Sequence, residues 1–96
     1  MLIAILKYTK SLAEVDALLP KHRQYLQTFF DQRKLLVCGR LNPRNGGVII
    51  AKNISRAEFE KILKNDPFTE VSEHTIIEFT PSQYDDCLKE IIEGEA

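Results

Sequence analysis

The segment Leu2–Tyr8 constrains the fold of this chain more than any other, because its sequence, LIAILKY, is apolar at nearly every position. A strand with one face in water alternates apolar and polar residues, whereas a strand buried on both faces does not. Leu2, Ala4 and Leu6 should point to one face of a sheet, and the isoleucines between them to the other. Any fold of this chain therefore has to cover both faces of the sheet around this strand.

Pro20 divides the first helical region. Ser11 and Glu14 form a capping box, which marks a helix start. Proline costs about 3 kcal/mol inside a helix but is favourable at the first helical position. We therefore expect a short turn at 12–18 and a main helix from Pro20 to about Arg33.

The remaining elements follow from similar patterns. Capping boxes at Ser55–Glu58 and Thr80–Gln83 predict a second helix and a C-terminal helix. Further strands are expected at 34–40, 46–52 and 74–79, and the turn-rich LNPRNGG joins the first two of these as a hairpin. The order β-α-β-β-α-β-α contains the split βαβ pattern of a ferredoxin-like α+β fold, in which an antiparallel sheet carries two helices on one face, with an extra C-terminal helix here.

The second face of this sheet needs a cover. In the strand expected at 46–52, Val48 and Ile50 oppose Ile49 and Ala51, so this strand is also apolar on both sides. Leaving an apolar face in water costs roughly 25 cal/mol per Å², and large exposed apolar patches usually mark an interface. We expect a homodimer packed sheet to sheet; the alternative is a monomer in which the C-terminal helix acts as a lid.

Composition limits the possible partners. The 96 residues have room for a single domain, 1–96, and 13 Lys and Arg against 14 Asp and Glu give a net charge of −1. This charge gives no electrostatic reason to expect nucleic acid, and GGVIIAK lacks the basic and aromatic residues on which RNA-recognition domains stack bases. An acylphosphatase-like anion loop is also excluded, since Tyr8–Ala13 contains neither glycine nor arginine.

Two cysteines, Cys38 and Cys87, are too few for a disulfide framework or a zinc site. We expect both to be reduced thiols that fill the core, and we expect no metal or redox cofactor. The apolar run after Met1 is too short for a signal peptide or a membrane span, so the expected location is cytoplasmic, without membrane contact.

His22 and Asp66 are the residues best suited to acid–base chemistry, but each also has a structural explanation. If the main helix begins at Pro20, His22 lies in its first turn, where the helix dipole disfavours the imidazolium. The neutral ring could act as a general base, or it could be a structural histidine held by one hydrogen bond. Asp66 could cap the turn at 67–71, or it could orient His22 as the second half of a dyad.

The hairpin supplies a third candidate. Arg40 ends the expected second strand beside Gly39, and its guanidinium could hold a carboxylate through two hydrogen bonds. The alternative is an exposed hairpin tip on which Arg40 and Arg44 are solvated. His74 opens the last expected strand at a water-exposed edge, where we expect a structural role.

Four short motifs resemble those of the YCII-related family. The segment PKHRQYLQTFFDQRKLLVCGRLNPRNGGVIIA, followed by NDPF and HTIIEF, carries them over residues 1–80. They are P-x-H at Pro20–His22, Gly39 at the end of the second strand, a third strand led by glycine, and D-P-[FY] at Asp66–Phe68. The family often has Gly-Pro after the second strand, whereas here Arg40 follows Gly39, so the pocket entrance and the ligand should differ.

The resemblance implies a small cytoplasmic protein of the dimeric α/β-barrel group, a homodimer with a His–Asp pair in each of two pockets. Matched by motif, that pair is His22 and Asp66. Some relatives resemble lyases that remove chloride from hydroxylated aromatic rings, with the pair as acid and base.

For this chain we expect an enzyme that carries out an elimination or isomerisation on a small anionic or phenolic compound. Asp66 would orient His22, His22 would move the proton, and Arg40 with Gly39 would bind the substrate. The alternative is a non-catalytic dimer that binds a small ligand or supports a larger protein.

Overall fold

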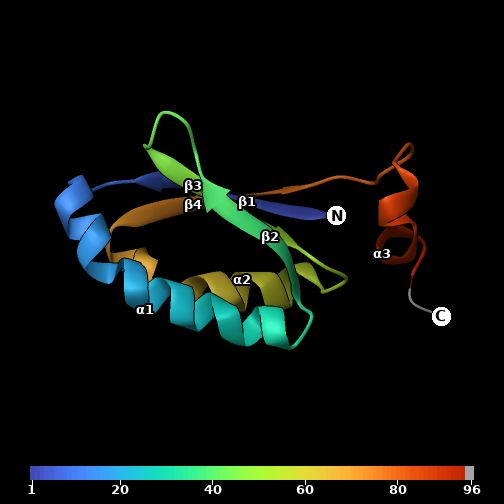
Figure 1. The fold of residues 1–96 in the computed structure, drawn as a ribbon, viewed down its shortest axis with the longest axis horizontal. Helices are drawn as coiled ribbons and strands as arrows, with labels where there is room; N and C mark the ends of the chain where they lie inside the picture. The colour runs from blue at the N-terminus through green and yellow to red at the C-terminus, as the bar shows by residue number, and fades with distance from the viewer. Residues whose placement is uncertain (95–96) are drawn as a thin grey trace.

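A computed structural model describes residues 1–94 and contains one four-stranded sheet. The elements are β1 (Leu2–Tyr8), α1 (Leu12–Asp31), β2 (Leu35–Arg40), β3 (Gly46–Ala51), α2 (Arg56–Lys64), the 3-10 turn η1 (Pro67–Glu70), β4 (Ser72–Glu78), the 3-10 turn η2 (Asp86–Leu88) and α3 (Lys89–Glu93). The strand order is β2-β3-β1-β4, and every neighbouring pair is antiparallel. Helices α1 and α2 cover one face of the sheet (Figure 1). The predicted ferredoxin-like α+β fold is therefore confirmed.

The core lies between the sheet and these two helices. Leu2, Ala4 and Leu6 are buried on the helix side, as the alternation along β1 predicts. From β3, Ile49 and Ala51 join them. The apolar residues of one sheet face thus account for the attachment of both helices.

Helix α1 runs without interruption past Pro20, so the prediction that the main helix begins at this proline was wrong. Ser11 caps the start of the helix and accepts a hydrogen bond from the backbone N–H of Glu14 at 3.3 Å. The first turns of α1 run at an angle to the rest of the helix (Figure 1), as expected where a proline removes a backbone donor. Val15, in these first turns, is completely buried in the core. Its packing offsets the cost of a proline inside the helix.

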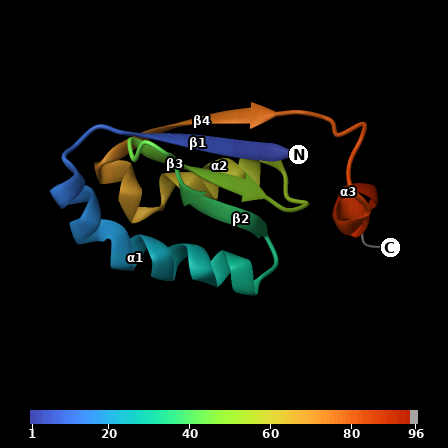
Figure 2. The same cartoon turned by 45° about the horizontal axis from the view of Figure 1, so that its top comes forward.

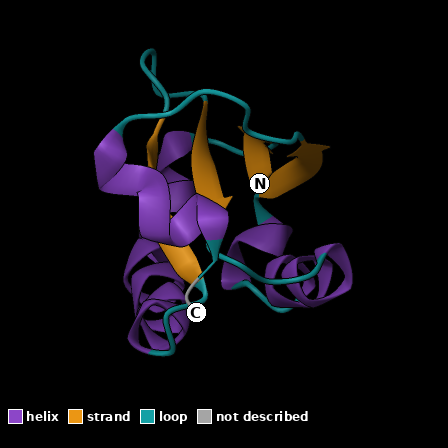
Figure 3. Ribbon diagram, turned by 90° about the vertical axis from the view of Figure 1, so that its right-hand side faces the viewer, coloured by secondary structure: helices purple, strands orange, loops and turns teal. Residues whose placement is uncertain are grey.

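The C-terminal helix is shorter and begins later than predicted. Residues 79–85 are not helical, so Thr80 caps nothing; Asp85 instead accepts a hydrogen bond from the Cys87 backbone N–H at 2.9 Å. Figure 2 shows α3 beyond the end of the sheet, and Figure 3 views the molecule from that end. Helix α3 therefore does not cover the open face of the sheet. Within residues 1–94, no helix is both long and apolar enough to cross a bilayer.

The sheet face opposite the helices is apolar and open in the single chain. The register places Val37, Ile50, Ile3 and Ile77 in one row across all four strands. Val37 is 50% exposed and Ile77 is 45% exposed, although both are large hydrophobic residues. We call these four residues the apolar row. Its exposure in the single chain agrees with the need for a cover that the sequence predicts.

Candidate functional site

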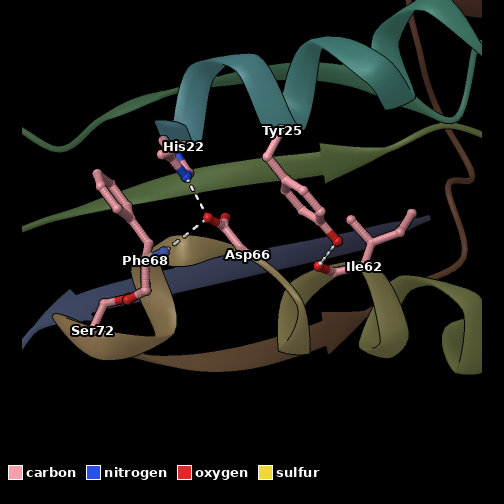
Figure 4. A network of polar contacts seen from close by, with 6 residues as sticks. All are labelled: His22, Tyr25, Ile62, Asp66, Phe68 and Ser72. Atoms are coloured by element: carbon pink, nitrogen blue, oxygen red, sulfur yellow. Dashed lines mark hydrogen bonds and ion pairs between the residues drawn. The ribbon is translucent and has the colours of Figure 1, made fainter. Parts of the chain in front are cut away.

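His22 and Asp66 lie 44 positions apart in the sequence but meet between α1 and η1 (Figure 4). His22 Nδ1 is 2.8 Å from Asp66 Oδ1. The Asp66 side chain is 2% exposed, and that of His22 is 12% exposed. Because an ionised carboxylate can only accept, Nδ1 carries the proton, and Nε2 of the neutral ring is left as an acceptor. The structure thus brings the two predicted site residues together.

Asp66 reaches this position because of the local sequence. It stands between the C-terminus of α2 and η1, and its extended backbone (φ −71°, ψ 133°) is the conformation favoured before Pro67. Its Oδ1 also accepts a hydrogen bond from the backbone N–H of Phe68 at 2.9 Å. The predicted cap is therefore present, and the same oxygen also contacts His22. Its other oxygen, Oδ2, is buried without a hydrogen-bond partner among residues 1–94.

His22 stands in the middle of α1, so the argument that placed it in the first turn of a helix was wrong. Its ring stacks on Phe68, with ring centroids 3.7 Å apart and planes within 4°. Phe68 in turn meets Tyr8 edge-on, at 6.2 Å. The orientation of the imidazole is therefore fixed by stacking and by the hydrogen bond to Asp66. Phe68 was missed as a site residue, although the D-P-F motif contains it.

Tyr25 joins the two helices beside this pair. Its hydroxyl donates a hydrogen bond to the backbone carbonyl of Ile62 in α2 at 2.6 Å (Figure 4). Burial raises the pKa of the Tyr25 hydroxyl, and the nearby charge of Asp66 raises it further. Tyr25 therefore helps to fix the distance between α1 and α2. This distance matters for the site, because Asp66 follows α2 and contacts His22 of α1.

A cleft of about 480 Å³ lies between α1 and the β2–β3 side of the sheet. Helix α1 lines it with residues at the i, i+3, i+4 spacing of one helical face. Its lining residues are Leu19, His22, Arg23, Leu26, Gln27 and Phe30 from α1, Cys38, Gly39 and Arg40 from β2, Gly47, Val48 and Ile49 from β3, and Leu6, Tyr8, Arg44 and Phe68. Three of the four predicted site residues, His22, Gly39 and Arg40, are therefore on the wall of one cleft, and Asp66 lies behind His22.

The two cysteines are exposed, so the prediction that they fill the core was wrong. Cys38 lines the cleft, because β2 is an edge strand and α1 does not pack tightly against this end of it. Although Cys38 as a residue is exposed, partial burial of its thiol in the cleft raises the pKa of the thiol. The charge of Asp66 raises this pKa further, and that of Arg23 lowers it. Cys87 lies in η2, away from the cleft.

Arg40 and Arg44 differ in their surroundings. Arg44 is not a solvated loop residue: its guanidinium forms an ion pair with Asp16 of α1. The hydrogen bond from Arg44 holds the pKa of the Asp16 carboxyl below its usual range. Arg40 is exposed and lines the cleft.

His74 is half-buried on the edge strand β4, opposite Leu6, and is not among the residues that line the cleft.

In the described part of the chain, no group of three or more His, Cys, Asp or Glu side chains is arranged to hold a metal ion. The side chains that line the cleft are an imidazole, a thiol, three guanidinium groups, the Tyr8 phenol, the Gln27 amide and an apolar wall.

Comparison with known proteins places the chain in a family. No curated protein matches it. Its structure is similar to that of 5-chloro-2-hydroxyhydroquinone dehydrochlorinase from Burkholderia phenoliruptrix AC1100, solved in complex with 2,5-dihydroxybenzoquinone. The TM-score is 0.65 and the identity 22%, over 82% of this chain and 93% of the other, which supports the fold. The model of the YCII-related domain matches residues 1–80. The chain therefore belongs to the YCII-related domain family.

Proposed function

We propose that this protein is an enzyme that transfers a proton to or from a small anionic or phenolic compound bound in the cleft, with His22 as the acid–base residue. The observation that carries this proposal is the 2.8 Å hydrogen bond from His22 Nδ1 to the buried Asp66, on the wall of a cleft of about 480 Å³. Clefts of this volume fit small organic ligands.

The pair supplies what an elimination or isomerisation needs. With its Nδ1 proton held by Asp66, His22 keeps a lone pair on Nε2 and can take a proton from a substrate hydroxyl or carbon. The imidazolium that forms is stabilised by the adjacent carboxylate, and it can return the proton to another atom or to water. The solved neighbour is named for a dehydrochlorination, a loss of HCl that also needs a group to accept a proton.

The remaining predicted site residues bind the substrate in this proposal. Arg40 offers a guanidinium to an anionic oxygen, and Gly39 contributes its backbone to the wall of the cleft. A Cβ atom added at Gly39 would meet no other atom within 4 Å. The half-buried apolar residues Leu19 and Phe30 offer a surface for a planar ring.

We further propose that the protein is a homodimer whose second copy covers the open face of the sheet. The apolar row crosses all four strands without a charged residue, so two such faces can pack on each other. Each copy would then keep its own cleft, since the clefts lie on the helix side.

The test is a turnover assay with substituted phenols, hydroxyquinones and small carboxylic acids, followed by mass spectrometry and by chloride release for halogenated members. His22→Gln and Asp66→Asn are compared with His74→Gln, which changes the histidine outside the cleft. We expect His22→Gln to lower kcat by at least about 100-fold, the usual contribution of an acid–base residue, and His74→Gln to change it little. If a panel member binds but wild type and His22→Gln never convert it, the non-catalytic ligand-binding alternative is correct.

A further inference from the structure

The charges around the cleft are unbalanced. Three arginines line it, Arg23, Arg40 and Arg44, and no aspartate or glutamate is among the lining residues that the structure describes. Two carboxylates, Asp16 and Asp66, contact lining residues from outside the cleft and are bonded to Arg44 and His22. The chain as a whole carries a net charge of −1, so the positive charge of the cleft lining is a local feature. An anionic ligand is therefore the kind of molecule that the cleft attracts.

Of the three guanidinium groups, that of Arg44 is in an ion pair, with Asp16. The charge of Arg40 also acts on Asp16, but the side chains of Arg23 and Arg40 form no hydrogen bond or ion pair with any residue in 1–94. A guanidinium carries five donors, and arginines with a structural role usually direct some of them at a carboxylate or a carbonyl. Arg23 and Arg40 are thus free to bind a ligand.

These two arginines stand on opposite walls of the same cleft. Arg23 follows His22 on α1, and Arg40 comes from β2. The register pairs Cys38 with Ile49 and Arg40 with Gly47, so both β2 side chains lie on the sheet face that α1 covers. The charge of Arg23 is felt at the Cys38 thiol, which agrees with a guanidinium directed from α1 toward β2. Gly47, opposite Arg40, has no side chain to fill the space beside it.

The cleft also has an apolar wall. Leu6, Leu26, Phe30 and Ile49 line it, and Leu6, Leu26 and Ile49 belong to the buried core. An inorganic anion would leave this apolar surface unused, whereas a planar ring with one charged group would use both parts of the cleft.

We propose that Arg23 and Arg40 form a carboxylate clamp, so that the substrate class of this site is a small aromatic carboxylate with its ring against the apolar wall. Each guanidinium donates to one or both carboxylate oxygens, and the ring lies on the side of the half-buried Leu19 and Phe30. The assignment of a substrate rests on the proposed function, but the clamp itself does not need His22. Arg23 thereby becomes a specificity-determining residue that the sequence alone did not identify.

The experiment compares 4-hydroxybenzoate with its neutral isostere, 4-hydroxybenzamide, by isothermal titration calorimetry. We expect the wild type to bind the carboxylate at least about tenfold more tightly than the amide, as charge-assisted hydrogen bonds predict. Arg23→Gln and Arg40→Gln should each remove most of this preference. The matched control Arg56→Gln changes an exposed arginine of α2 outside the cleft and should retain it. Melting temperatures of all variants should stay close to that of the wild type, because neither clamp arginine makes a contact that the fold needs.

The clamp is overturned if the wild type binds the two compounds equally or binds neither, or if both cleft variants keep the preference for the carboxylate. Failure of the proposed function gives a different result. If carboxylates bind through the clamp but none is converted, only the proposed reaction is overturned. If neutral phenols are converted in a His22-dependent way and carboxylates are not preferred, only the clamp is overturned.

Discussion

At the scale of single residues, one oxygen atom organises the site. Oδ1 of Asp66 accepts hydrogen bonds from His22 Nδ1 and from the backbone N–H of Phe68. The same atom therefore caps η1 and fixes the imidazole that stacks on Phe68. Any change that removes this oxygen therefore removes both the cap of η1 and the hydrogen bond that orients His22.

Replacing Asp66 by alanine should destabilise the protein by about 2 kcal/mol, because it removes a cap worth about 1 kcal/mol and a buried hydrogen bond of similar size. Asp66→Asn keeps an oxygen that can accept from Phe68 and should cost less. Urea denaturation of the wild type and both variants measures the free energies of unfolding. Equal stability of wild type and Asp66→Ala would show that the cap contributes nothing.

Two glycines provide a matched pair for backbone packing. A Cβ atom at Gly46 would lie 1.9 Å from the carbonyl oxygen of Leu6, so β1 and β3 would have to separate. We expect Gly46→Ala to lower the free energy of unfolding by about 3 kcal/mol, the upper part of the range for overpacking. Gly39→Ala, where nothing lies within 4 Å, should change it by less than about 0.5 kcal/mol. Thermal unfolding followed by circular dichroism distinguishes the two, and similar melting temperatures would contradict this account.

At the scale of elements, the sequence predicts those helices and strands whose position depends on a local residue pattern. The continuous apolar runs at 2–8 and 46–52 predicted β1 and β3, and the capping serines Ser11 and Ser55 predicted the starts of α1 and α2. The two wrong boundaries depend on packing that no local pattern contains. Pro20 stays inside α1 because Val15 is buried in the core, and the capping box at Thr80 fails where no residue of the following α3 is buried.

The site was less predictable than the fold for the same reason. Spacing gives no sign that residues 22 and 66 meet, and the pairing was expected only from the family resemblance. Cys38 was placed in the core because cysteines are usually buried, but it faces a cleft at an edge strand. The arginine that the sequence did not single out, Arg23, is recognised only once the helical face that lines the cleft is known.

The contact of Tyr25 between α1 and α2 predicts a dependence of stability on alkaline pH. The pKa of Tyr25 is raised in the folded protein, so above about pH 10 the unfolded chain loses this proton while the folded chain retains it. Proton release then favours unfolding, and the stabilisation by Tyr25 is present below pH 10 and decreases above it. Tyr25→Phe should be less stable than the wild type at pH 7, and the difference should shrink between pH 10 and 11.5. Denaturant midpoints at several pH values measure this, and a constant difference would contradict the assignment.

At the scale of the whole molecule, the main feature is the apolar sheet face that no helix of the single chain covers. Helices α1 and α2 lie on the other face, and α3 lies beyond the end of the sheet (Figure 2). The apolar row therefore meets water unless another surface covers it. A second copy is the partner that we propose.

Light scattering coupled to gel filtration tests the dimer. The wild type should have twice the 11.0 kDa mass of the chain, and Ile77→Lys should have the mass of one chain, because it places a charge in the apolar row. Leu12→Lys is the control, since Leu12 is also a large exposed hydrophobic residue (44%) but lies on α1. A wild type with the mass of one chain, or an Ile77→Lys variant that remains paired, would contradict the sheet-to-sheet arrangement.

Arg23 and Arg40 lie in a different environment from Asp66, and this difference bears on how such a protein can evolve. The side chains of Arg23 and Arg40 form no hydrogen bond or ion pair within residues 1–94, so substitutions at these two positions should cost little folding free energy. Asp66 holds a turn together, so drift there is penalised even when catalysis is not under selection. If the proposed function holds, a lineage built on this scaffold can acquire new ligands by exchanging Arg23 and Arg40 while the His22–Asp66 pair is retained.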